Sequence, residues 1–341
     1  MNHCTNQSMP GIRRWAGRIA VVVATVLAMG GGQSVAQTVP SLGTVTIAVF
    51  PGGLTNTTTT LMVRKGILAK YGVTAKLIPL PSGPGMVASM VGGSSDFADV
   101  APWLSWPLVK QGQCIKYLTG GLGNVGDLVA QPDLKLPKLS RGFPDSITDL
   151  KGMRIGVVAL GSGTQIWVEM LLKSAGMSPK DVTFIAVGGN ASAVVAFQQK
   201  LVDVAVVYPP IYQTLLQNPG FQMIANWTKS NPPTLDNMVQ SGIQATCAFA
   251  NAHPEIVQAL CKASAETHAY MMDPRNEAAV AAYTAENMGS SEADGLALWR
   301  QYKASFRSSA FTPEQWEGQR PFTADGFIPK YGDVVIPGCA T

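Results

Sequence analysis

Apolar runs and helix-like segments alternate along most of the chain. Residues 44–50 form an apolar run rich in β-branched residues, and a helix-like segment (61–72) and a second run (73–80) follow it. A loop of small residues (82–85), a short helical segment and the run 97–101 complete this unit. Alternating strands and helices predict parallel sheets with helices on both faces.

The second half of the chain repeats the order. Residues 153–159 lead into a loop, a helical segment, the run 182–187, another loop, another helical segment and the run 204–208. The two endings align without a gap, because residues 96–102 and 203–209 share Asp, Ala, Val and Pro at the same places. We therefore predict two α/β units of one design. The chain beyond Pro254 is predicted to be mainly helical.

The loops of both units follow strands at the edge where α/β sheets bind ligands. Each loop opens a helix, whose first N–H groups have no partner within the helix. The polar side chains of these loops are uncharged hydroxyls and amides: Thr55, Asn56, Thr57, Ser82, Ser162, Thr164 and Asn190. Such residues also form turns and cap helices, which is the alternative for each one singly. Trp103 and Tyr208 follow the paired strand ends, and we favour them as ligand walls.

The start of the chain has the pattern of an export signal. Arg13, Arg14 and Arg18 precede an uncharged stretch (19–29), and a small-x-small motif ends at Ala36. The stretch is shorter than the roughly 20 apolar residues of a membrane-spanning helix, which argues against an anchor. We predict a signal peptide (1–36) cleaved after Ala36, with general and twin-arginine export both open, and a periplasmic product.

Composition argues against a nucleic-acid partner. Charged residues make up 13% of the chain and the formal net charge is +4. The predicted signal carries three arginines and no acid, so the mature chain is close to neutral. A nucleic-acid-binding domain needs a basic face, which a near-neutral chain does not favour.

The glycine loop at Gly161 and Gly163 fails the nucleotide-binding patterns. The third glycine of a dinucleotide fingerprint would fall at Ile166, and Ser162 stands where a P-loop has lysine. Of the histidines, His253 and His268 remain after signal removal, and both lie far in sequence from the loops. No acid and histidine cluster has metal-ligand spacing. We therefore expect a protein that is not an enzyme and has no cofactor, metal or catalytic residue.

Four cysteines remain after signal removal. Cys247 and Cys261 flank a short connection between a strand and a helix, so they form either a disulfide or two buried thiols. Export makes a disulfide possible, and the residues do not decide between the alternatives. The partners of Cys114 and Cys339 are left open.

The order of four short segments resembles a known family. These segments are 66–73 (GILAKYGV), 92–98 (GGSSDFA), 149–157 (DLKGMRIGV) and 201–205 (LVDVA). They resemble the periplasmic substrate-binding proteins of ABC transporters, in the nitrate/sulfonate/taurine branch and close to the thiamine-precursor binders. The resemblance covers nearly the whole mature chain.

The resemblance implies a two-lobed α/β fold of the type 2 periplasmic binding proteins, each lobe a mostly parallel sheet flanked by helices. Lobe one would hold residues 37–130 and 246–341, and lobe two 131–245, with crossings near 128–131 and 244–248. Carried over residue by residue, the ligand site would comprise Gly53, Leu54, Thr55, Asn56, Ser82, Gly83, Asp99, Trp103, Ser162, Gly163, Thr164, Asn190 and Tyr208.

The resemblance also implies partners and a function. We expect a monomer that captures a small organic solute or oxyanion and delivers it to an ABC transporter permease in the membrane. The loops contain no Lys or Arg, so an uncharged or aromatic ligand is as compatible as an anion. Two alternatives stay open, namely a ligand-sensing protein for a membrane receptor and an enzyme on the same scaffold.

Overall fold

The computed structural model describes residues 40–209, 220–229, 236–307, 309–323 and 325–339. The predicted signal peptide (1–36) lies outside the described residues. In the part of the chain that is described, no helix combines the length and the apolar character needed to cross a membrane.

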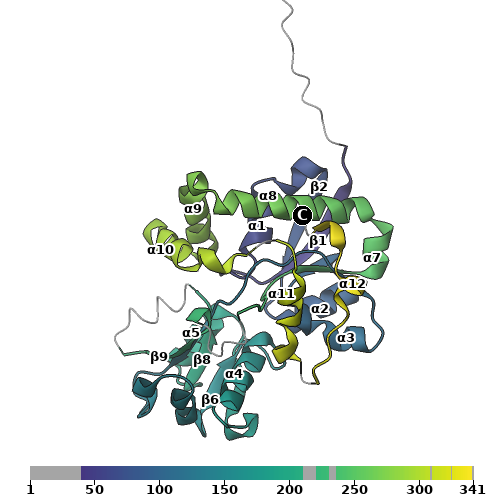
Figure 1. Ribbon diagram of the computed structural model, residues 1–341. Helices are drawn as coiled ribbons and strands as arrows, with labels where there is room; N and C mark the ends of the chain where they lie inside the picture. The colour runs from purple at the N-terminus through teal and green to yellow at the C-terminus, as the bar shows by residue number, and fades with distance from the viewer. Residues whose placement is uncertain (1–39, 210–219, 230–235, 308, 324, 340–341) are drawn as a thin grey trace, which may run out of the picture. The chain divides into compact units, whose positions relative to one another are not determined.

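Two five-stranded sheets form the framework, and their strand orders match (Figure 1). The first has the order β2-β1-β3-β10-β4 and the second β7-β6-β8-β5-β9. In each sheet the fourth strand in this order is antiparallel to both neighbours, and the other pairings are parallel. The strands are β1 (Gly43–Val49), β2 (Val73–Pro79), β3 (Phe97–Asp99), β4 (Ile115–Tyr117), β5 (Asp127–Ala130), β6 (Arg154–Val157), β7 (Thr183–Ala186), β8 (Val204–Val207), β9 (Gln222–Asn226) and β10 (Ile243–Thr246).

Helices cover both faces of the two sheets. Figure 1 shows α1 and α8 beside β1 and β2, and α4 and α5 on the second sheet. The helical region predicted beyond Pro254 forms, with Pro254 as the first residue of its longest helix. The helices are α1 (Thr57–Arg64), α2 (Gly83–Val91), α3 (Trp106–Lys110), α4 (Gly163–Ser174), α5 (Asn190–Gln198), α7 (Cys247–Ala252), α8 (Pro254–Met272), α9 (Glu277–Met288), α10 (Glu292–Tyr302), α11 (Pro313–Glu317) and α12 (Tyr331–Val334).

The side-chain alternation of the strands builds the two faces of each sheet. Along β1, Val45, Ile47 and Val49 pack toward α1 and α8, whereas Ala48 packs with the α2 residues. In the second sheet, Val129, Ala205 and Val207 pack on α5, and Leu128, Ile155 and Val206 pack with the α4 residues. Both faces of each sheet are therefore buried, which explains why the strands are almost continuously apolar.

The aligned aspartates of the repeat, Asp96 and Asp203, have matching structural roles. The Asp96 carboxylate accepts hydrogen bonds from the N–H and hydroxyl of Thr46, at 2.7 and 2.8 Å. The Asp203 carboxylate accepts from the N–H of Arg154 at 2.7 Å and from its guanidinium. Each aspartate ties the strand that follows it to the first strand of its unit. The shared Asp thus stabilises the pairing of these two strands in each sheet.

Asp203→Asn is expected to make the free energy of unfolding depend less on pH in the acid range. The hydrogen bonds from Arg154 lower the pKa of the Asp203 carboxyl, so the ionised form is favoured in the folded state. Its contribution is complete above the unfolded value of about 3.9 and is lost as the pH falls through the lower folded-state pKa. Urea unfolding from neutral pH to strong acid should show the variant less stable at neutral pH, with the difference vanishing in acid. A constant difference would contradict this role.

The passages between the sheets differ from the expected crossings. Residues 128–130 lie in β5 of the second sheet, and residues 244–246 lie in β10 of the first. The chain therefore passes between the sheets over residues 118–126, and the described residues of its return are 227–229 and 236–242. The difference arises because each sheet contains an antiparallel strand, β10 or β5, that follows directly after a passage. The sequence repeat shows only the parallel strands, so it does not reveal these two.

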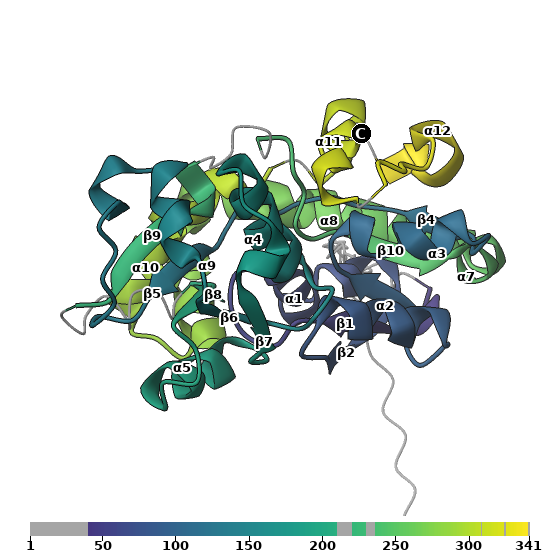
Figure 2. The same ribbon diagram turned by 90° about the horizontal axis from the view of Figure 1, so that it is seen from below.

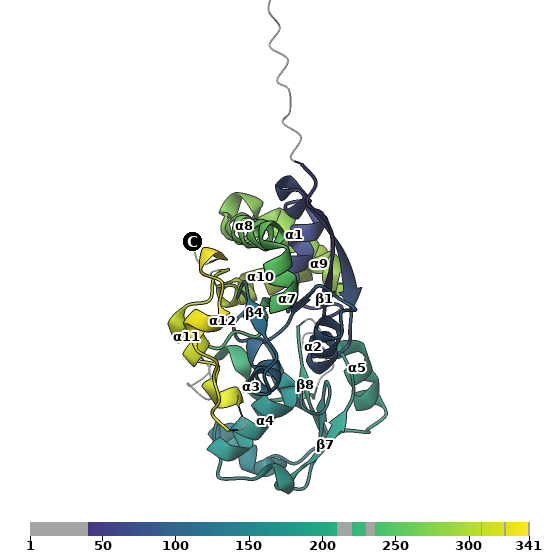
Figure 3. The same cartoon turned by 90° about the vertical axis from the view of Figure 1, so that its right-hand side faces the viewer.

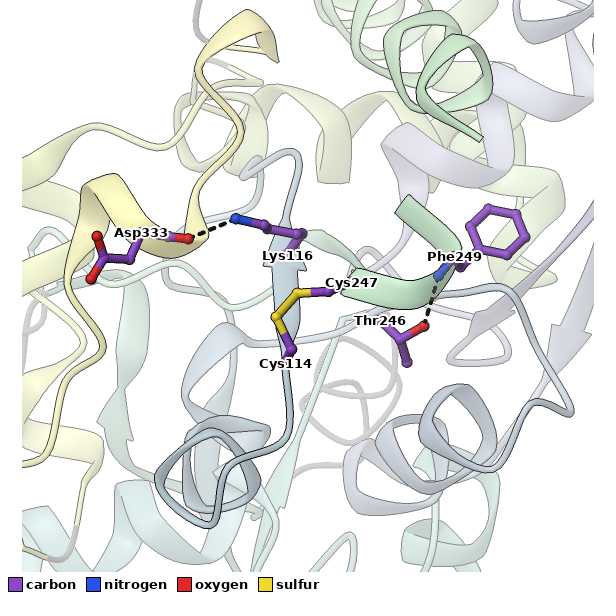
Figure 4. The surroundings of a disulfide bond; sticks show 6 residues. All are labelled: Cys114, Lys116, Thr246, Cys247, Phe249 and Asp333. Carbon is purple, nitrogen blue, oxygen red and sulfur yellow. Dashed lines mark hydrogen bonds between the residues drawn. A yellow bond between two sulfur atoms is a disulfide. The ribbon is translucent and has the colours of Figure 1, made fainter. Parts of the chain in front are cut away.

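The disulfides correct the pairing considered for Cys247 and Cys261. Cys247 is bonded to Cys114, with 5.3 Å between their Cα atoms, and Cys261 is bonded to Cys339, at 4.7 Å. The antiparallel pairing of β10 with β4 explains the first bond, because it carries Cys247 to Cys114 at the ends of the two strands. The backbone N–H of Cys247 also donates to the carbonyl of Cys114, at 2.9 Å. Figure 4 shows the bond beside the Lys116–Asp333 and Phe249–Thr246 contacts.

Peptide mapping without reduction is expected to recover the pairs Cys114–Cys247 and Cys261–Cys339. The bonded residues are 133 and 78 positions apart, so each bond closes a long loop of the unfolded chain. Replacing Cys114 and Cys247 together by serine should lower the free energy of unfolding by about 2–5 kcal/mol. A peptide that links Cys247 to Cys261 would overturn the assignment.

Candidate functional site

An inner cavity lies between residues of the first and second sheets. Its volume is about 60 Å³, and its lining is largely apolar. The lining residues are Phe50, Thr55, Gly83, Met86, Asp99, Val100, Ala101, Trp103, Leu104, Val158, Ser162, Gly163, Thr164, Tyr208, Trp227 and Gln240. The cavity therefore lies at the carboxyl ends of β3, β6 and β8, as the sequence predicts for a doubly wound sheet.

The two sides of the cavity lie close together at Gly163 and Trp103. A Cβ atom on Gly163 would lie 2.6 Å from Cη2 of the Trp103 ring. Trp103 belongs to the first sheet's β3–α3 connection, whereas Gly163 is the first residue of α4 on the second. Glycine is required here because any side chain would separate these two surfaces.

The hydroxyls of Ser162 and Thr164 hold the loop that opens α4. They lie 2.8 Å apart, and the Thr164 hydroxyl accepts the N–H of Val158 at 2.9 Å. The Ser162 hydroxyl accepts the N–H of Ala159 at 3.3 Å. These bonds fix the start of α4 at the cavity, where its first N–H groups have no partner within the helix. A negative or acceptor group is favoured at such a helix end.

Four near-parallel aromatic rings extend from the cavity into the second sheet's helix layer. Trp103 stacks on Phe322, with 4.8 Å between ring centroids, and Phe322 faces Trp227 at 6.4 Å. Trp227 in turn stacks on Trp167, at 4.4 Å. Rings at these separations attract one another beyond the area they bury. Two rings of the stack, Trp103 and Trp227, line the cavity, and Phe322 of the C-terminal region lies between them.

The indole N–H groups of Trp103 and Trp227 are buried donors that have no hydrogen-bond partner in the described chain. Trp103 is 3% exposed and Trp227 is completely buried, and both line the cavity. Leaving a buried donor unpaired costs about 1–3 kcal/mol. An acceptor group on a ligand would remove this cost, provided that it reached them.

Asp99 is the one residue with an ionisable carboxyl among the described lining residues, which include no Lys, Arg or His. Burial raises the pKa of this carboxyl, and hydrogen bonds that include one from Ser241, with 2.6 Å between oxygens, act in the opposite direction. The shift favours the neutral acid, so Asp99 repels an anionic group less than an exposed carboxylate would.

Residues of the return passage form part of the cavity wall. The side chain of Gln240 donates to the Tyr208 hydroxyl at 3.1 Å and accepts the N–H of Val125 at 3.2 Å. Ser241, the next residue, bonds Asp99 of the first sheet, and its backbone bridges Leu122 of the outward passage. The two passages are therefore paired with each other beside the cavity.

The structure brings many of the predicted site residues together and places others in supporting roles. Those that line the cavity are Thr55, Gly83, Asp99, Trp103, Ser162, Gly163, Thr164 and Tyr208. Leu54 is a core residue, and Ser82 caps α2 by accepting the N–H of Gly85 at 3.2 Å.

Asn56 and Gly53 also act within the protein framework. The Asn56 amide accepts the N–H of Phe50 and donates to the carbonyl of Asp99, at 2.5 and 2.8 Å. The Gly53 carbonyl accepts from Asn287, at 3.0 Å. Asn190 begins α5, and its side chain lies outside the described residues.

Sequence reasoning missed several cavity residues, of which Trp227 and Gln240 are the most informative. Neither belongs to the repeated units, since both lie on the return passage between β9 and β10. The other missed residues are mainly apolar: Phe50, Met86, Val100, Ala101, Leu104 and Val158. Apolar residues near strand ends resemble core residues in a sequence, so only Trp227, placed after an apolar run, offered a signal.

Within the described ranges, no group of three or more His, Cys, Asp or Glu side chains is placed to hold a metal ion. The cavity therefore offers hydrogen-bond donors, hydroxyls and aromatic surface. Such a set can enclose and orient a small molecule.

Comparison with known proteins places this arrangement in a family. The sequence model of the NMT1-like family matches residues 40–285, which covers both sheets and the cavity. The chain belongs to the NMT1-like family. A curated protein of this kind from Brucella abortus (strain 2308), provisionally named a binding protein, is 29% identical over 168 residues, or 49% of each chain. The chain spans about half the length of the curated relatives it matches.

Solved structures show the fold of this NMT1-like protein to be that of periplasmic binding proteins. A protein from Bordetella bronchiseptica RB50 superposes with a TM-score of 0.72 at 22% identity, over 87% of this chain and 95% of that one. The alkanesulfonate-binding protein SsuA from Xanthomonas axonopodis pv. citri, solved with MOPS, gives 0.65 at 18% identity, over 87% and 98%. The family resemblance and the fold class expected from the sequence are confirmed.

Proposed function

We propose that this NMT1-like protein is an exported solute-binding protein. It captures a small organic solute or oxyanion between two lobes, each built on one of the sheets, and delivers it to an ABC transporter permease. In this proposal it acts as a monomer in the periplasm and catalyses no reaction.

The observation that carries the proposal is a cavity between the two sheets that is lined by Trp103 and Trp227, whose buried indole N–H groups have no partner in the described chain. The start of α4 adds backbone donors to the same space, at Gly163 and Thr164. A site that has hydrogen-bond donors but no basic side chain suits a solute with acceptor oxygens, such as a carboxylate, a sulfonate or a polar carbonyl. The names of the relatives agree with a binding role.

Capture is expected to involve a hinge between the lobes. The described residues that connect the sheets are 118–126 on the outward passage and 227–229 and 236–242 on the return passage, and the two passages are paired through Leu122 and Ser241. A small change at such connections can separate the faces that carry Trp103 and Gly163. Opening would admit a solute, and closure would exclude water around it.

The test is a binding screen of the mature protein. Thermal shift against sulfonates, nitrate, aromatic acids and pyrimidines should reveal a stabilising solute, because a ligand that binds only the folded state raises the unfolding temperature. Calorimetry on each hit should give one site per chain. The solute should be recovered unchanged after long incubation, and turnover would favour an enzyme.

Uptake distinguishes transport from sensing. Deleting the gene should reduce uptake of the bound solute, and restoring the wild-type protein should recover it. Uptake that stays normal in the deletion strain, together with a lost response to the solute, would favour the receptor-partner alternative.

Mass spectrometry of the exported protein is expected to give a chain that starts at Gln37. The basic start, the apolar stretch and the small residues before Ala36 are the features that a signal peptidase reads. Replacing Ala36 by a bulky residue such as Phe should block cleavage. An exported chain that still carries residues 1–36 would contradict the proposed processing.

A further inference from the structure

An outer pocket adjoins the inner cavity and shares Trp103 and Leu104 with it. Its volume is about 580 Å³, compared with about 60 Å³ for the inner cavity. A volume of several hundred Å³ is typical of pockets that hold small organic molecules. The inner cavity has room only for a compact group, so the larger part of an extended solute needs a second space.

The walls of the outer pocket come from three separate parts of the fold. Trp106 and Pro107 lie in α3, Ile166 lies in the first turns of α4, and Phe322 and Phe327 belong to the C-terminal region. Figures 2 and 3 show α11 and α12 of this region beside α3 and β4. The pocket is therefore closed by a segment that the repeated units do not contain.

The C-terminal wall is held in place by specific contacts. Phe322 stacks on Trp103, and the Trp316 indole donates to the carbonyl of Pro329 at 2.7 Å. The Lys110 ammonium pairs with Asp325 and lies 5.9 Å from the centroid of the Phe327 ring. The cation at this pocket already has an anionic partner, so the pocket has no net charge to select a charged group.

The accessible apolar surface of the outer pocket comes mainly from Leu104, Ile166 and Phe327, which are partly exposed. Trp103, Trp106 and Phe322 are almost completely buried and form the backing of its wall. Such a lining favours an apolar group, because removing apolar surface from water is favourable. The inner cavity is too small for such a group, so the two spaces differ in the size of the group that each can hold.

We propose that the outer pocket holds the larger, apolar part of the same solute whose acceptor group occupies the inner cavity. This inference rests on the proposed function and narrows the solute class to compounds that join a compact oxyanion or carbonyl head to an apolar part such as a ring. Trp103 is the shared wall, since it lines both spaces.

The experiment uses two matched series of probes: acetate, benzoate and naphthoate, and methanesulfonate, benzenesulfonate and naphthalenesulfonate. Affinities are measured by calorimetry for the wild-type protein, Phe327→Ala and Ile166→Trp. The first variant removes an outer ring and the second fills the outer pocket, and neither residue lines the inner cavity. Phe221→Ala is the matched control, since Phe221 is also partly buried and lines neither pocket.

In at least one series, the aromatic members should bind the wild type about tenfold more tightly or better than the smallest member. Phe327→Ala and Ile166→Trp should remove this gain and leave the affinity for the smallest member unchanged, and Phe221→Ala should retain it. Binding of small acids without a gain from the ring, or a gain that both variants retain, would overturn the outer pocket alone. Absence of binding by every probe would overturn this solute class, while a hit from the wider screen would preserve the proposed function.

Discussion

Trp103→Phe is expected to lower solute affinity by about tenfold to a hundredfold, because a hydrogen bond to a charged acceptor contributes about 1.5–3 kcal/mol. The substitution removes the indole N–H, which has no partner within the described protein, and keeps an aromatic ring against Phe322. Calorimetry with the solute identified by the screen measures the loss. The far-ultraviolet spectrum should be that of the wild type.

Trp167→Phe is the matched control for this prediction. Trp167 is also fully buried and its indole N–H also has no partner in the described chain, but it does not line the inner cavity. Its substitution removes the same atoms from the same aromatic stack. Affinity should therefore stay near the wild-type value in this variant. An equal loss in both variants would mean that the stack acts through stability rather than through a bond to the solute.

Gly163→Ala is expected to weaken solute binding by roughly fivefold to a hundredfold, the range given by an overpacking cost of about 1–3 kcal/mol. The new Cβ would lie 2.6 Å from the Trp103 ring and would hold the two sides of the cavity apart. The solute-free protein should keep its stability, because it can relax by opening and because alanine favours the helix that begins at this residue. Stopped-flow dissociation should show most of the loss as faster release.

Gly189→Ala tests whether the effect of Gly163→Ala is specific. Gly189 precedes α5 as a glycine of the same sheet edge, and a Cβ there would lie 3.4 Å from Phe50, which is ordinary contact. We expect its affinity to match the wild type. If Gly163→Ala also binds normally, the contact between Gly163 and Trp103 does not define the bound state.

The repeat was readable from the sequence because its physical causes are local. The buried strands required continuous apolar runs, and the helices required small residues where they approach the cavity. Asp96 and Asp203 were visible as an aligned pair because both anchor a strand to its neighbour at the same place in the two sheets. The loops at Gly83 and Gly163 could be placed at the cavity for the same reason, since parallel strands end at one edge.

The parts that escaped prediction depend on long-range placement. No local pattern indicates that β10 returns to the first sheet beside β4, yet this pairing determines that Cys247 meets Cys114. Phe322 lies in an irregular region, and its role follows only from its stack on Trp103. Asn56 carries the residue type of a ligand contact, but its amide is occupied by the backbone of Phe50 and Asp99.

The most direct measurement is a crystal structure of the protein with its solute bound. We expect acceptor atoms of the solute within about 2.7–3.2 Å of the Trp103 indole nitrogen or the first backbone nitrogens of α4, with Gly163 against the Trp103 ring. A solute bound elsewhere on the protein, with the cavity between the two sheets filled only by water, would contradict the central claim.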